Sequence, residues 1–128
     1  MMTMANHLLL LAGVVLSPVA AIKLWETPGD ISSSVPAGCR VALTQNITCD
    51  LLVTPNQAQN EMSLPDAAVD LYCADTCRDS VASFQKRVSD SCGHKLYVFE
   101  KEGSMERSAQ QMAEGFTWAQ NLMCIQEG

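Results

Sequence analysis

The stretch CADTCRDSVASFQKRVSDSC, residues 73–92, decides which fold we predict for this chain. Within it, two cysteines and three apolar residues recur at intervals of 4, 3, 4 and 4: Cys77, Val81, Phe84, Val88 and Cys92. These intervals follow the turn of an α-helix, so the five side chains share one face, which we expect to be buried. The spacing therefore predicts a helix from Thr76 to Cys92, which the glycine at position 93 ends.

Two further helices are expected upstream of this stretch. Apolar side chains recur there every four positions: Cys39, Leu43, Ile47 and Leu51. This spacing predicts a helix over residues 37–53, ended by the Thr54-Pro55 pair, and a polar loop over residues 56–63. A second helix is expected over residues 63–75, because Ser63 and Asp66 have the spacing of a capping box.

Residues 104–124 are predicted to form the last helix. One face of this helix is apolar and holds Met105, Ala109, Met112, Phe116, Ala119 and Met123. The segment KLYVF, residues 95–99, is too short for periodicity to distinguish a strand from an apolar loop. The predicted fold class is all-α, a small disulfide-stapled four-helix domain after a signal peptide.

The first 21 residues differ in composition from the rest of the chain. They contain no Asp, Glu, Lys or Arg, and the apolar run LLLLAGVVL at residues 8–16 precedes Pro18 and two small residues, Ala20 and Ala21. This pattern is typical of a secretory signal peptide, and the run is shorter than the ~20 residues of a membrane-spanning helix. We therefore predict a signal peptide at residues 1–21, a flexible lead-in at 22–36 and a cysteine-rich helical domain at 37–128. The predicted protein is secreted and has no stable membrane span.

The six cysteines all lie after the predicted signal peptide, at Cys39, Cys49, Cys73, Cys77, Cys92 and Cys124. An even number of cysteines in a short secreted chain implies three disulfides, and the sequence leaves their pairing open. We expect Cys73 and Cys77 to bond to cysteines of other elements. A metal site formed by Cys73, Cys77, Cys92 and His94 is the alternative, but it requires reduced thiols. The Cys-x-x-x-Cys spacing also differs from that of a thioredoxin-like redox site.

Catalytic patterns are not recognised in this sequence. His94 is the one histidine after residue 21, and there is no Gly-x-Ser-x-Gly turn. The net charge of -6 argues against nucleic acid as a partner. We therefore predict a protein that is not an enzyme, with no catalytic residue, no metal ligand and no cofactor.

Two residues are candidates for roles at the surface. Asn46 opens the sequon Asn46-Ile47-Thr48 and points away from the predicted buried stripe, so we predict N-glycosylation there. Trp118 lies off the apolar face of the last helix and is a candidate ligand contact. On that face, Met105, Met112 and Met123 could bind a varied partner, because methionine adapts to different surfaces, but we expect them to pack in the core.

Several short motifs together resemble a known family. They are Cys39-Arg-Val-Ala-Leu43, Asn46-Ile-Thr-Cys49-Asp50, Leu71-Tyr-Cys73, Cys77-Arg-Asp-Ser-Val81, Val88-Ser-Asp-Ser-Cys92 and Asn121-Leu-Met-Cys124. This arrangement is similar to the cysteine-rich helical region that precedes or separates the LysM domains of secreted fungal LysM proteins. The family continues past Cys124 to a further tyrosine and cysteine, which this sequence lacks. The resemblance therefore implies an unpaired Cys124, which could link two chains in a dimer.

Two functional interpretations follow from the resemblance and the composition. The first is a secreted, non-catalytic accessory or effector-like domain whose partner is a cell-wall polysaccharide or a host protein. Chitin binding in the family belongs to the LysM module, and no segment after Cys92 fits that module. The alternative is a small lipid- or sterol-binding helical protein similar to elicitins. A closed apolar pocket beside Phe84 and Met112 would favour the lipid-carrier interpretation. A filled core with an exposed tryptophan would favour the accessory-domain interpretation.

Overall fold

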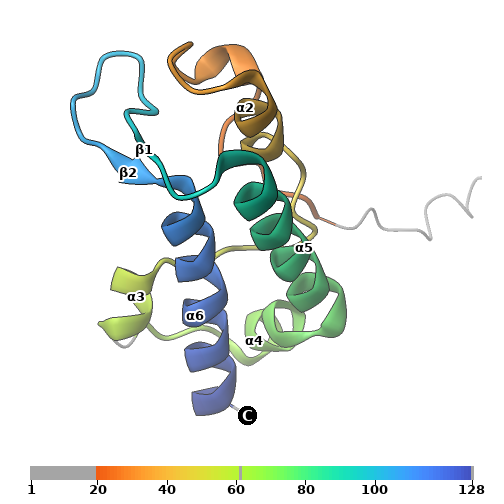
Figure 1. The fold of residues 1–128 in the computed structure, drawn as a ribbon. Helices are drawn as coiled ribbons and strands as arrows, with labels where there is room; N and C mark the ends of the chain where they lie inside the picture. Colours follow the sequence, from red (N-terminus) through yellow and green to blue (C-terminus); the bar gives the residue numbers. More distant parts are fainter. Residues whose placement is uncertain (1–19, 61, 128) are drawn as a thin grey trace, which may run out of the picture.

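The computed structural model describes residues 20–60 and 62–127 and is mostly helical (Figure 1). The helices are η1 (Pro28–Asp30), α2 (Ala37–Leu43), α3 (Pro55–Gln59), α4 (Asp66–Cys73), α5 (Asp75–Cys92) and α6 (Ala109–Glu127). Two short strands, β1 (Leu96–Tyr97) and β2 (Arg107–Ser108), pair antiparallel. The all-α prediction is confirmed. Among the helices of the described residues, none is long and apolar enough to cross a membrane. The predicted signal peptide lies almost wholly outside these residues.

Helices α5 and α6 form the centre of the molecule and run side by side (Figure 1). The five residues of the predicted stripe on α5 are all buried, which confirms that interpretation. Phe84 of α5 meets Phe116 of α6 edge to face, with ring centroids 6.5 Å apart. Gly93 ends α5 with a φ of 65°, a conformation that glycine adopts without strain, and its N–H donates to Ser89 O.

Helix α2 ends at Leu43, ten residues before the predicted end at 53. The Thr44 hydroxyl donates to the carbonyls of Arg40 and Val41, both at 3.1 Å, and so satisfies acceptors of the last turn. The chain then extends, and Ile47 exchanges two backbone hydrogen bonds with Ile22, each 2.8 Å long. Cys39, Leu43 and Ile47 are all buried, as predicted. The helix predicted to contain all three ends at Leu43, so Ile47 is buried from an extended segment.

The segment predicted as a loop after Pro55 begins with a helix, α3. Thr54 and Gln57 form a capping box, in which the Thr54 hydroxyl accepts from Gln57 N–H and the Gln57 side chain accepts from Thr54 N–H. Pro55 occupies the first helical position, where a missing N–H costs nothing. The prediction was wrong because this proline starts a helix and does not end one. Pro55 also packs on α6, since its Cγ lies 3.0 Å from where a Cβ on Gly115 would be.

The other helix boundaries also shift from their predicted positions. Helix α4 starts at Asp66 with Pro65 as its N-cap, so the capping box predicted at Ser63 does not form. A proline disfavours helical geometry at the residue before it, which excludes a start at Ser63. Helix α6 starts at Ala109, five residues after the predicted start, because β2 uses the residues before it to pair with β1.

The expected lead-in, residues 22–36, contributes to the core in part. Ile31 and Val35 are fully buried, and Ser32 N–H donates to Phe99 O at 2.9 Å. Trp25 is half-buried, and its ring centroid lies 5.9 Å from that of Phe99. The buried core therefore includes residues upstream of residue 37. The domain boundaries themselves stay predictions.

Candidate functional site

Three intramolecular disulfides join all six cysteines. Their pairs are Cys39–Cys92, Cys49–Cys77 and Cys73–Cys124. As predicted, neighbouring Cys73 and Cys77 bond to cysteines of other elements. The expectation of an unpaired Cys124 and of a dimer through it is wrong, because Cys73 at the end of α4 reaches this sulfur within the same chain. The sulfurs of the alternative metal site are all bonded to other cysteines, so they are not thiolate ligands.

A buried glutamine joins the central elements and was not singled out by the sequence. Gln120 of α6 is 3% exposed. Its Nε2 donates to Tyr72 O at 2.9 Å and lies 3.3 Å from Cys77 Sγ. A buried amide needs such partners, because an unpaired polar group is costly away from water. The glutamine therefore holds the junction of α4 and α5 against α6 and has a structural role.

Burial changes the acidity of a tyrosine at the same junction. Desolvation raises the pKa of Tyr72 from 10.0 to about 12, and the Val53 backbone and the Arg78 charge oppose this shift. The neutral phenol is thus favoured in the folded protein. Because the folded-state pKa lies above the unfolded one, the associated stability is present below pH 10 and is lost as the pH rises toward 12.

We expect the phenol of Tyr72 to titrate with a midpoint near pH 12 in the variant Tyr97→Phe, in which Tyr72 is the one remaining tyrosine. The measurement is phenolate ultraviolet absorbance against pH. In urea the same variant should titrate near pH 10, which is the internal control. A folded-state midpoint near 10 in this variant would contradict the burial argument.

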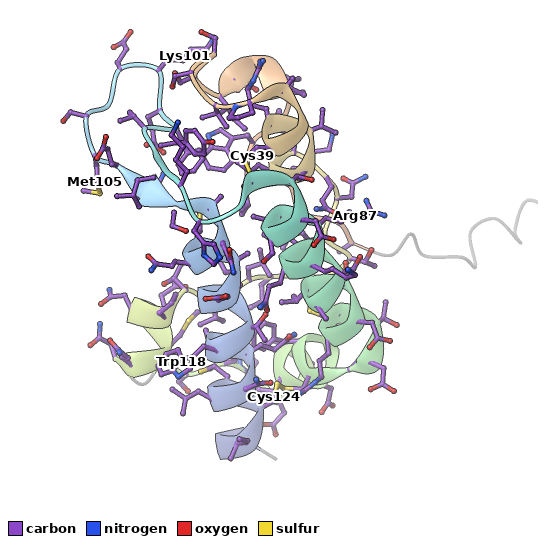
Figure 2. The ribbon with its side chains drawn as sticks, in the orientation of Figure 1. Cys39, Arg87, Lys101, Met105, Trp118 and Cys124 are labelled. Atoms are coloured by element: carbon purple, nitrogen blue, oxygen red, sulfur yellow. A yellow bond between two sulfur atoms is a disulfide. The ribbon has the colours of Figure 1, made fainter. Side chains whose placement is uncertain are left out.

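An exposed stripe runs along α6. Five residues recur at helical spacing and are all exposed: Gln111, Glu114, Trp118, Asn121 and Ile125. Trp118 is 45% exposed and Ile125 is 77% exposed, although both are large and apolar. Figure 2 shows Trp118 on the side of α6 that faces α3, and Cys124 on the side of α4. The sequence singled out Trp118 for its place off the apolar face, and the same argument could have found Ile125.

The methionines of the predicted core face divide into three environments. Met123 is buried, as expected, and Met112 is half-buried against the core. Met105 is 68% exposed, so its assignment to the core was wrong. It precedes β2 and lies outside the helix, so helical periodicity does not apply to it. Figure 2 shows Met105 at the edge of the hairpin, away from α5.

Two surface depressions on the described part of the chain are open to solvent. One, of about 350 Å³, lies between α2 and α5 beside Val41 and Arg87. The other, of about 410 Å³, lies beside the hairpin and is lined by Leu96 and Met112. Phe84 lines neither of these depressions and is 1% exposed. Neither of these two depressions is the closed pocket beside Phe84 and Met112 that the lipid-carrier interpretation requires.

Asn46 is exposed in the turn after α2, between the end of the helix and the bridge formed by Ile47. Thr48 follows, and its N–H donates to Ser80 Oγ at 2.7 Å. We expect the protein secreted from a eukaryotic host to lose mass on treatment with an N-glycosidase, and the variant Asn46→Gln to show no such loss. Unchanged mass of the unsubstituted protein would contradict this prediction.

Comparisons with known proteins agree with the resemblance found in the sequence. The family model described as the secreted LysM effector N-terminal domain matches residues 27–128. The secreted LysM effector LysM10 of Penicillium expansum is 32% identical over 108 residues, which cover 84% of this chain and 39% of that protein. No solved structure gives a significant match. The chain is therefore a secreted protein that belongs to the family of secreted LysM effector N-terminal domains.

Proposed function

We propose that this chain is a non-catalytic accessory domain of a secreted LysM effector and that it binds an extracellular partner through the surface around Trp118. The partner classes are a cell-wall polysaccharide and a host protein. The observation that carries this proposal is the exposed tryptophan on a domain whose core is filled and cross-linked. Tryptophan is enriched at binding surfaces because it offers a large apolar area at a low cost in conformational entropy.

The packing around Phe84 supports binding at the surface over enclosure of a ligand. Phe84 packs edge to face on Phe116, which occupies the space between α5 and α6. A carrier of a lipid or sterol needs a cavity that buries most of the ligand. The three disulfides also restrict the opening of the helices that such a ligand would require. A rigid surface suits a binding module, because little ordering entropy is lost on association.

The two tryptophans allow this proposal to be tested with intrinsic fluorescence. In the variant Trp25→Phe, Trp118 is the one remaining tryptophan, and in Trp118→Phe only Trp25 remains. We titrate each variant with soluble fungal cell-wall fragments and, separately, with extracellular proteins of a host plant. We expect a saturable change in the emission of Trp118 with one of the two probes, and no change in the emission of Trp25.

Besides the absence of any signal, two results of this titration would contradict the proposal. One is a saturable change that appears only in the Trp118→Phe variant, because binding would then lie at the Trp25 end of the molecule. The other is the release of shortened fragments from either probe, which would show catalysis. An unchanged signal with both probes at high concentration would also remove the support for a partner at Trp118.

A further inference from the structure

Most acidic residues of the protein lie in two segments of the chain. Residues 50–79 and 109–127 hold eight acidic residues and one basic residue, a net charge of -7. The rest of the chain holds six acidic and seven basic residues, a net charge of +1. In Figure 1 these segments include α3, α4, the start of α5 and α6, and α6 runs from the hairpin to the end opposite α2. We call the end formed by α4, the start of α5 and the second half of α6 the acidic end.

Carboxylates at this end are exposed and arranged in like-charged pairs. Asp66 and Asp70 are four residues apart on α4, and Asp75 and Asp79 are four residues apart on α5. All four are exposed. Like charges at this spacing repel each other on a helix. In the described part of the chain, the two ion pairs involve other carboxylates, those of Asp90 and Glu100.

The one basic residue of these segments already has a partner in the fold. Arg78 is half-buried, and its Nη2 donates to Asn121 Oδ1 at 3.1 Å. Asn121 lies between Trp118 and Ile125 on the exposed stripe of α6, and Arg78 directly precedes Asp79. This contact joins the first turns of α5 to α6 at Asn121. The Cys73–Cys124 disulfide, with Cα atoms 5.7 Å apart, fixes the end of α4 to the same part of α6.

Three large apolar side chains are exposed on the same helices. Leu71 of α4 is 53% exposed, and it directly follows Asp70. Trp118 and Ile125 lie two turns apart on α6, a helix that has no Lys or Arg between residues 109 and 127. Exposed apolar side chains that lie beside unpaired charge of one sign are typical of an interaction surface. The acidic end thus combines an apolar contact area with a negative potential.

We propose that the acidic end docks a basic amphipathic segment of another protein, an inference that rests on the proposed function and names its partner class. Lys and Arg side chains of such a segment neutralise the carboxylates, while its apolar side chains cover Trp118 and Ile125. A neutral polysaccharide brings no charge to compensate the desolvated carboxylates. An anionic membrane surface is repelled by the same carboxylates.

The test compares two variants that lose the same charge at opposite ends. The first is Asp66→Asn, Asp70→Asn and Asp79→Asn, three substitutions at the acidic end. The second, the matched control, is Glu26→Gln, Glu102→Gln and Glu106→Gln, which are exposed on the other part of the molecule. The probe is a fluorescent peptide of two LKKLLKL heptads, and fluorescence anisotropy gives its Kd for the full chain.

We expect the acidic-end variant to weaken binding of the peptide by about tenfold and the control variant by less than about twofold. Trp118→Ala should also weaken binding by about tenfold, and Met105→Ala, which removes an exposed apolar side chain elsewhere, should not. A peptide in which Ser replaces Leu keeps the charge and should bind about tenfold more weakly than the LKKLLKL peptide.

Equal weakening by the two charge variants overturns the inference, because binding then follows net charge alone. Equal affinity for the Ser-substituted peptide overturns it as well, since the apolar stripe then takes no part. A further titration with soluble fungal cell-wall fragments distinguishes failure of this inference from failure of the proposed function. If these fragments shift Trp118 emission in Trp25→Phe proteins with and without the acidic-end substitutions, and the peptide does not, the partner is a polysaccharide. In that case the basic-segment inference fails and the proposed function stands.

Discussion

Replacement of Phe84 by alanine should lower the free energy of unfolding by about 3–5 kcal/mol, the typical cost of truncating a buried aromatic ring. Phe84 is 1% exposed and lies at the centre of the α5 stripe. The truncation leaves a cavity between α5 and α6 and removes the edge-to-face contact with Phe116. Because both helices are cross-linked to the rest of the chain, we expect little collapse into this space. Urea denaturation followed by circular dichroism measures the change.

The matched control for this substitution is Val41→Ala. Val41 is apolar but 60% exposed on α2, so its truncation should change the free energy of unfolding by less than about 0.5 kcal/mol. A cost below about 1 kcal/mol for Phe84→Ala would show that the ring does not fill the core. It would also reopen the possibility of an internal cavity between α5 and α6, on which a carrier function depends.

The double variant Cys39→Ala, Cys92→Ala should lose about 4 kcal/mol of stability. The disulfide closes a loop between residues 53 positions apart, and its removal gives the unfolded chain more conformations. Cys39 is fully buried, so the loss of the two sulfur atoms adds a packing cost to the entropic one. The bond also joins the short helix α2 to the C-terminal end of α5. We therefore expect α2 to lose its hydrogen-exchange protection first.

The comparison variant is Cys73→Ala, Cys124→Ala, which opens a loop of nearly the same length, 51 positions. Both of these cysteines are only half-buried, so the packing cost should be smaller and the total loss should lie below that of the first variant. Denaturant unfolding without reductant gives both values. A loss below about 1 kcal/mol for Cys39→Ala, Cys92→Ala would contradict a stapling role for this disulfide.

Helix α5 is the element that its own sequence predicts best. Its buried residues follow one continuous helical spacing over four turns, and a glycine follows at once. The helical spacing of this stretch agrees with the tertiary environment that buries it, so the boundaries stay close to their predicted positions. The predicted start at Thr76 differs by one residue from the observed start at Asp75.

The first predicted helix shows where local spacing is insufficient. Cys39, Leu43 and Ile47 are all buried, yet Ile47 is buried in an extended segment paired with Ile22. An interval of four residues also places side chains on one face of an extended strand, so burial alone does not distinguish the two conformations. The pairing with Ile22 involves residues 25 positions away in the chain, a contact that a local pattern does not contain.

The candidate surface was only partly accessible to sequence reasoning. The place of Trp118 off the apolar face follows from helical geometry, and its exposure is observed. The packing of the second half of α6 against α4 and the start of α5 does not follow in the same way, because about 40 residues of the chain separate these segments. The Arg78–Asn121 hydrogen bond and the Cys73–Cys124 disulfide bring these segments together. Both contacts depend on how α6 packs against α4 and α5.

The sequence by itself determined the helical class, the secreted character, the family and the buried stripe of α5, because each depends on composition or on residues within a few turns of one another. Only the tertiary structure decided the pairing of the cysteines, the end of α2, the start of α6 and the acidic end. These features depend on contacts between segments distant in the chain. Such contacts form when the helices bury a shared core, and this burial, rather than local propensity, selects among the conformations that the local sequence permits.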